Sequence, residues 1–215
     1  MPSDDIERPQ ETLNVAKQYL RRERPLTALV VVLVVSIFLG TYLVTSILPA
    51  VIVAAILLIT VRSPILQSKG TFRLRTDSDL ETVTDEFTGP IPPVLALQWG
   101  VADEVTSDGD VAIYPVSYLF GLRSVEVAVH TQAETTPNGD YVVESEVMIN
   151  DQPWGMYTSR ISNTKEDTII EVEYTSERRV GLRRIPQHLV ANRYRDDALT
   201  AQGYTVVERD AHFGL

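Results

Sequence analysis

The chain has 215 residues, enough for one ordinary domain and an additional segment, and it has no cysteine. Disulfides, thiolate metal sites and cysteine nucleophiles are therefore excluded. The formal net charge is −10, with 16 arginines against three lysines, so nucleic acid is excluded as a partner for most of this surface. A large acidic excess with scarce lysine is typical of proteins that work at high salt, and it predicts a halophilic protein.

Residues 1–24 are polar and contain a short amphipathic pattern. Its apolar residues are Leu13, Ala16, Tyr19 and Leu20, which recur at helical spacing beside basic residues. Such a helix can lie on anionic lipid headgroups, or it can be a solvated helix that leads into the next segment. Both interpretations stay open.

Residues 26–61 contain no Asp, Glu, Lys or Arg. One continuous helix of this length would rise about 54 Å, well beyond the roughly 30 Å hydrocarbon core of a bilayer. The sequence therefore predicts a transmembrane hairpin over residues 25–62. Its turn is expected at Thr45–Ser46, with Pro49 in the first turn of the second helix, or alternatively at Gly40–Thr41.

Basic residues flank the apolar run on both sides. They are Lys17, Arg21, Arg22 and Arg24 before it, and Arg62, Lys69, Arg73 and Arg75 after it. Because basic residues mark the cytoplasmic side of a membrane, the hairpin predicts a multi-pass protein of the cell membrane. Both termini and the soluble domain would then lie in the cytoplasm.

Residues 70–215 show the pattern of an α+β domain. A strand near residues 72–75 precedes a short helix that Ser78 or Asp79 can cap, and a second short helix follows the proline-rich residues 90–93. Strand-length segments then fall at residues 100–106, 111–119, 122–131, 141–149, 154–161 and 168–175, separated by turn signals such as Asn138–Gly139. A helix over residues 185–202, capped by Gly203, and a strand-like piece at 204–209 end the chain.

This order of elements resembles the START-like helix-grip superfamily (SRPBCC), which includes polyketide cyclases and lipid-transfer domains. The resemblance covers residues 70–202, and the tail from Gly203 to Leu215 departs from it. It implies a six- to seven-stranded antiparallel sheet wrapped on a long C-terminal helix, with an apolar cavity between them. Aromatic residues that can line the cavity or fill the core are Trp99, Tyr114, Tyr118, Trp154, Tyr174 and Tyr194.

Arginines are concentrated just before and within the last helix. Residues 178–195 contain six arginines and no acid, whereas residues 77–177 contain 20 acids and three basic residues. The membrane-surface candidates are Arg178, Arg179, Arg183 and Arg184. The alternative is that these arginines pair with the carboxylates of the domain.

No motif for catalysis, metal binding or cofactor binding stands out. His130, His188 and His212 have no metal-ligand spacing, and the nucleophile and nucleotide motifs are missing from the sequence. We therefore expect a non-catalytic protein without cofactor or metal that binds a lipid or another hydrophobic ligand. Its expected partners are membrane lipids, a hydrophobic small molecule and a membrane protein. The alternatives are an assembly module of a membrane complex and a cyclase-like enzyme.

Overall fold

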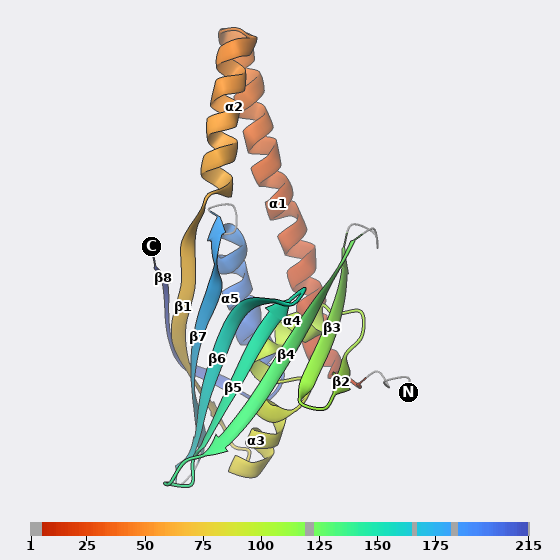
Figure 1. Cartoon of the computed structure of the whole chain (residues 1–215), viewed down its shortest axis with the longest axis vertical. Helices are drawn as coiled ribbons and strands as arrows, with labels where there is room; N and C mark the ends of the chain where they lie inside the picture. The colour runs from red at the N-terminus through yellow and green to blue at the C-terminus, as the bar shows by residue number, and fades with distance from the viewer. Residues whose placement is uncertain (1–5, 119–122, 165–166, 182–184, 215) are drawn as a thin grey trace.

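The computed structural model describes residues 6–118, 123–164, 167–181 and 185–214. Within them, eight antiparallel strands form one curved sheet (Figure 1). The strands are β1 (Pro64–Thr76), β2 (Thr106–Asp108), β3 (Val111–Tyr118), β4 (Arg123–Thr135), β5 (Tyr141–Ile149), β6 (Gln152–Asn163), β7 (Thr168–Gly181) and β8 (Thr205–Gly214). The helices are α1 (Gln10–Val44), α2 (Ile47–Arg62), α3 (Leu80–Thr88), the 3₁₀ turn η1 (Pro93–Leu95), α4 (Ala96–Gly100) and α5 (Ile185–Thr200).

The sheet has the strand order β2-β3-β4-β5-β6-β7-β1-β8. The predicted order of one strand, two short helices, six antiparallel strands and a long helix is confirmed, so the domain is START-like in its arrangement. The predicted number of six to seven strands is wrong, because the described part of the chain has eight. The additional strand is β8, which lies in the tail and pairs with β1.

The meander follows from alternating side chains and from turn residues. In β4, Val127 and Val129 are buried while the residues between and beside them are more exposed, as expected of a sheet with one covered face. Gly139 has a φ of 87° in the turn between β4 and β5, which confirms the predicted hairpin. Gly203 also has a φ of 87°, and Tyr204 N donates to Leu199 O at 3.0 Å, which ends α5 as predicted.

The strand predicted at residues 100–106 is wrong. Residues 96–100 belong to α4, and β2 is a short strand of three residues that begins at Thr106. Trp99 explains the helix: its side chain is fully buried, and its indole N–H donates to Pro92 O at 3.0 Å. The N-cap of the preceding helix α3 is Asp79, one of the two predicted residues, which accepts from Thr82 N at 2.9 Å.

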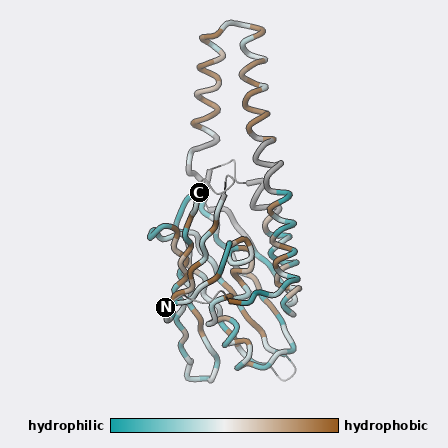
Figure 2. Tube along the Cα trace, turned by 90° about the vertical axis from the view of Figure 1, so that its right-hand side faces the viewer, coloured by the Kyte–Doolittle hydropathy of each residue, from teal (hydrophilic) through white to brown (hydrophobic). Residues whose placement is uncertain are grey.

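Helices α1 and α2 form a hairpin that projects from one end of the domain (Figures 1 and 2). The turn lies at Thr45–Ser46, the first of the two predicted positions, and Pro49 is in the first turn of α2. Apolar side chains of the hairpin are exposed on every side: Val31, Val32 and Leu33 are consecutive and each is more than half exposed.

The prediction that this hairpin crosses a membrane is wrong. None of the helices in the described ranges combines the length and the apolar character that a crossing requires. Helix α2 has 16 residues and rises about 24 Å, short of the roughly 30 Å hydrocarbon core. Helix α1 has 35 residues, but its first half packs against the domain. The multi-pass localisation, with both termini and the domain in the cytoplasm, depended on this crossing and is wrong with it.

The first half of α1 is held against α4 and α5. Thr12 and Ala16 are fully buried, and the ring of Tyr19 meets that of Tyr194 in α5 edge-on, with centroids 5.9 Å apart. Just before the helix, the Arg8 guanidinium donates to Ala102 O at 2.8 Å. The base of the hairpin is therefore part of the folded domain.

We predict that Gly100→Ala lowers the free energy of unfolding by about 1–3 kcal/mol, because overpacking strains the interface between α1 and α4. A Cβ at Gly100 would lie 2.8 Å from Ala16 Cβ. Chemical denaturation measures the effect. Adding Ala16→Gly should recover part of the loss. The control is Gly40→Ala, which meets nothing within 4 Å and should not destabilise the protein. Equal stability of the two single variants would contradict this packing.

Candidate functional site

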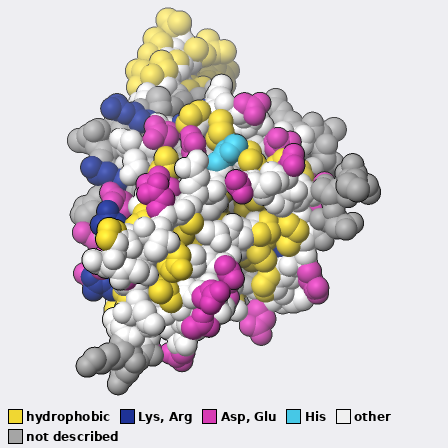
Figure 3. All heavy atoms as spheres, turned by 60° about the horizontal axis from the view of Figure 1, so that its bottom comes forward, with side chains coloured by type: hydrophobic (Ala, Val, Ile, Leu, Met, Phe, Trp, Pro, Cys, Tyr) yellow, Lys and Arg dark blue, Asp and Glu magenta, His cyan; other side chains and the backbone are white. Residues whose placement is uncertain are grey.

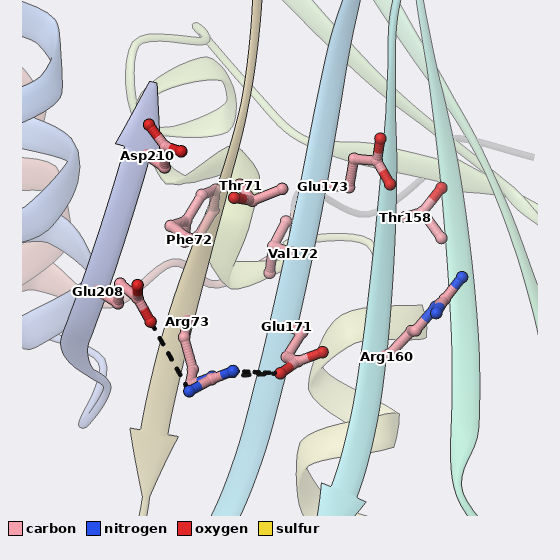
Figure 4. Close-up of a pocket in the computed structure, with 10 residues that line it drawn as sticks. All are labelled: Thr71, Phe72, Arg73, Thr158, Arg160, Glu171, Val172, Glu173, Glu208 and Asp210. Carbon is pink, nitrogen blue, oxygen red and sulfur yellow. Dashed lines mark hydrogen bonds and ion pairs between the residues drawn. The ribbon is translucent and has the colours of Figure 1, made fainter. Parts of the chain in front are cut away.

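The outer face of the sheet has a hollow of about 350 Å³ over β8, β1, β7 and β6 (Figure 4). Most of the side chains around it are charged: Arg73, Arg160, Glu171, Glu173, Glu208 and Asp210. Arg73 lies between two carboxylates, with Nη2 at 2.7 Å from Glu171 Oε1 and Nη1 at 3.7 Å from Glu208 Oε2. These side chains are 45%, 55% and 70% exposed, so water screens their attraction.

This outer hollow is best explained as a solvated ladder of opposite charges across neighbouring strands. Among the residues that the structure describes, no group of three or more His, Asp or Glu side chains is placed to hold a metal ion. Acidic side chains are also scattered over the face in Figure 3, so the outer carboxylates are not confined to the hollow.

The inner face of the sheet, which faces α5, is closed at one end and less closed at the other. Away from the hairpin, Val143, Ile161 and Ile170 are no more than 1% exposed. Towards the hairpin, Val125 and Ile149 are only partly buried. Their inward orientation follows from the register, because Ile149 pairs with buried Val127 and Val125 lies two residues before Val127. An apolar surface therefore remains incompletely covered at this end of the inner face.

A row of aromatic rings crosses the inner face from β1 to β6. Phe72 in β1 lies 6.3 Å from Tyr174 in β7, and Tyr174 lies 6.0 Å from Tyr157 in β6, centroid to centroid. Helix α5 packs against α1, α4, η1 and β8. From α5, Arg195 reaches the aromatic row, with its guanidinium carbon 5.7 Å from the centroid of the Tyr174 ring.

A second arginine reaches the same row from β8. Arg209 pairs with Phe72 in the ladder of β1 and β8, and its guanidinium carbon lies 5.1 Å from the Phe72 centroid. Asp196 in α5 forms an ion pair with Arg209. Arg195 and Arg209 thus enter the inner side of the sheet from opposite elements, with one carboxylate between them.

Burial is the largest cause of the pKa shifts of Arg209 and Asp196. It lowers the pKa of Arg209, and the neighbouring Arg195 lowers it further, while Asp196 opposes the shift. Burial also raises the pKa of Asp196, as does the exposed carboxylate of Asp197, although both arginines counteract this. Arg195, Arg209 and Asp196 together carry one formal positive charge in a partly buried place, with the exposed Asp197 beside them.

The structure separates the predicted cavity residues into two groups. Trp99 and Tyr114 are fully buried core residues; the Tyr114 hydroxyl donates to Pro90 O at 2.8 Å, and burial raises its pKa. Tyr174 lies on the inner side near Arg195 and is 8% exposed, whereas Tyr194 packs against Tyr19 of α1 and is 7% exposed. Trp154 is partly buried. The side chain of Tyr118 lies outside the described residues.

The predicted membrane-surface arginines are only partly described. Arg178 and Arg179 lie in β7, where Arg178 donates to the side chain of Gln152 in β6. Arg183 and Arg184 lie outside the described residues. His130 is exposed on β4, and the side chains of His188 and His212 lie outside the described residues.

Sequence reasoning singled out neither Arg195 nor Arg209 as a site residue. Arg195 was one of six arginines in the segment 178–195, and nothing in the sequence separates it from the others. Arg209 becomes relevant only through the pairing of β8 with β1, which places it opposite Phe72. Alternation in the sequence gives no register between these two strands.

No protein-family model and no curated protein matches this chain. Similar solved structures include Mll3558 from Rhizobium loti, with 16% identity and a TM-score of 0.42, covering 63% of this chain and 96% of that chain. A conserved protein from Geobacillus kaustophilus has 11% identity and a TM-score of 0.42, covering 68% of this chain and 99% of that chain. A START superfamily protein from Mycobacterium smegmatis has 10% identity and a TM-score of 0.39, covering 63% and 97%.

At these identities and TM-scores the likenesses carry no argument about function. The halophilic interpretation of the composition and the membrane hairpin find no support in them. The START-like arrangement of this domain lies in its element order and in the antiparallel pairing of its strands.

We predict that Arg73→Gln changes the free energy of unfolding by no more than about 1 kcal/mol, because its ion pairs are exposed and screened. The measurement is chemical denaturation at low and at high salt, and the difference between the proteins should shrink as salt rises. A loss of several kcal/mol would show that the outer hollow is a buried charge network rather than a solvated surface.

Proposed function

We propose that this domain binds a hydrophobic small molecule between the inner face of its sheet and helix α5. The observation that carries the proposal is the incomplete burial of inward apolar residues at the hairpin end, where Val116, Val125 and Ile149 are partly exposed. The remainder of the inner face is covered almost completely. Burial of such a surface by an apolar ligand is favourable, at about 25 cal/mol per Å² removed from water.

The aromatic row supports this location. Tyr157 pairs with Ser145 in β5, four residues before Ile149, and Tyr174 pairs with Tyr157. The two rings stack with an interplanar angle of 26°. Rings of this kind give a large and rigid apolar surface at small entropic cost. A ligand entering from the hairpin end would therefore meet Val125 and Ile149 first and the tyrosines deeper inside.

The domain offers a local reporter for binding. Both tryptophans of the chain, Trp99 and Trp154, lie in the domain, and the hairpin has none. Quenching of their fluorescence by 9,10-dibromostearyl alcohol, an uncharged apolar probe, therefore reports on the domain and not on the exposed hairpin. The full chain should show saturable quenching with one probe per chain.

We predict that Val125→Asp weakens the binding of this probe about tenfold or more, because it places a charge on the apolar inner face. The matched control is Val207→Asp in β8, where the native side chain is 56% exposed; it should leave the affinity unchanged. Circular dichroism establishes that both variants keep the fold. Unsaturable quenching of the native chain, or equal effects of the two substitutions, would contradict the proposed function.

A second proposal concerns the hairpin: its exposed helices contact the hydrocarbon of membrane lipids, without crossing the bilayer. Leu43, Val44 and Leu48 at the tip are 81%, 85% and 69% exposed. A helix that packs on a protein core has an apolar side towards the core and a polar side towards water. The projecting parts of α1 and α2 lack such a polar side, because exposed apolar residues lie all around them (Figure 2). Arg21, Arg22 and Lys69 are exposed on the segments at its base and are complementary to anionic headgroups.

We predict that the full chain floats with vesicles of phosphatidylcholine and phosphatidylglycerol, and that Leu43→Glu together with Leu48→Glu abolishes flotation, because charges cannot enter hydrocarbon cheaply. Gln132→Glu in β4, an exposed position far from the tip, is the control and should float as the native chain does. Flotation that survives the tip substitutions would contradict lipid contact. So would a lipid-free dimer that the tip substitutions dissociate.

A further inference from the structure

Three nitrogen atoms of the inner arginine pair, Arg195 and Arg209, are buried without a hydrogen-bond partner among the described residues. They are Arg195 Nε, Arg209 Nε and Arg209 Nη1. Arg195 has only a long contact, from Nη1 to Asn192 Oδ1 at 3.5 Å, and Arg209 has Asp196. Buried donors on charged groups are nearly always satisfied in folded proteins, so these three require an explanation.

The neighbouring aromatic rings do not satisfy these three N–H donors. The faces of Phe72 and Tyr174 attract the two guanidinium groups, at 5.1 Å and 5.7 Å from the ring centroids. Such contacts stabilise the charge but offer no oxygen to accept the N–H bonds. Asp196 neutralises one of the two positive charges, which leaves the pair with an excess of both charge and donors.

The placement of the pair matches one end of the proposed ligand site. Arg209 sits over Phe72, and Phe72, Tyr174 and Tyr157 form the aromatic row that leads from β1 towards β6. Beyond Tyr157, the ladder of β5 and β6 leads to the partly covered end around Ile149. A ligand with its chain along this row would bring its head group to the arginines.

We infer that Arg195 and Arg209 bind the oxyanion head group of a single-chain amphipathic ligand, such as the carboxylate of a fatty acid or the phosphate of a monoester. The inference rests on the proposed function and specifies its ligand class. Guanidinium groups present paired N–H donors with the geometry of a carboxylate or phosphate, and hydrogen bonds between ions are about twice as strong as neutral ones.

An anionic head group should bind the arginine pair more tightly than an uncharged polar head group. An uncharged alcohol can accept one hydrogen bond but cannot balance the remaining positive charge of the pair. An oxyanion can accept several N–H bonds and also neutralise this charge, which removes the cost of leaving the donors unsatisfied. Asp196 limits the gain, because its carboxylate competes for Arg209 and repels the incoming anion.

The test compares three probes with the same dibrominated chain on the full-length protein at pH 8: 9,10-dibromostearate, 9,10-dibromostearyl phosphate and 9,10-dibromostearyl alcohol. Tryptophan quenching gives each affinity. At least one anion should bind about tenfold or more tightly than the alcohol, and the tighter anion identifies the head group as carboxylate or phosphate. This ratio is measured on the native chain and needs no variant.

Arg195→Gln combined with Arg209→Gln should bring the ratio of anion to alcohol affinity close to one, with the alcohol affinity preserved. Arg209→Lys retains the charge and should retain part of the preference. Arg73→Gln, which lies on the outer face of β1, is the matched control and should leave the ratio unchanged.

Two results would overturn the inference while the proposed function stands. One is equal affinity for the alcohol and both anions in the native chain. The other is an anion preference that persists in a folded Arg195→Gln, Arg209→Gln variant. If none of the three probes quenches saturably, the proposed function is contradicted together with the inference.

Discussion

The pairing of β1 on both of its edges is the constraint on which the rest of the structure depends. β1 enters the sheet between β7, from the end of the meander, and β8, from the tail of the chain. Without this pairing β7 would be an open edge, and the tail would have no partner. The same strand begins at Pro64, two residues after α2 ends, so it also ties the hairpin to the sheet.

The pairing of β1 with β7 and β8 places arginines in different environments on the two faces of the sheet. On the outer face Arg73 meets Glu171 of β7 and Glu208 of β8 in water, and these pairs contribute little stability. One residue earlier, Phe72 points inward and lies under the guanidinium group of Arg209. Arg73 is thus solvated on the outer face, whereas Arg209 is desolvated on the inner face. An unsatisfied hydrogen-bond donor costs more free energy in the desolvated position.

The sequence predicted the START-like arrangement well from local patterns. Alternation in β4 and β7, the Asn138–Gly139 turn, the cap at Asp79 and the end of α5 at Gly203 all depend on residues close together in the chain. The predictions that were wrong depended on context. Residues 100–106 were predicted as a strand, but the helix predicted before them extends to Gly100, and the next strand begins only at Thr106. The apolar run was predicted to form two membrane spans, but α2 has only 16 residues, and no helix in the described ranges is long and apolar enough to cross a bilayer.

The sequence by itself determined the order of strands and helices, the presence of a helical hairpin and the acidic character of the chain, because spacing, turn residues and composition are local properties. Of the two turn positions that the sequence left open, the structure selected Thr45–Ser46. Only the tertiary structure decided which of the many arginines became buried, since this depends on the register of β8 against β1 and on the distance of α5 from the sheet. Arg195 and Arg209 are 14 residues apart in the chain and ordinary in composition. They become a pair because α5 brings Arg195 over the ring of Tyr174 and β8 brings Arg209 over the neighbouring ring of Phe72.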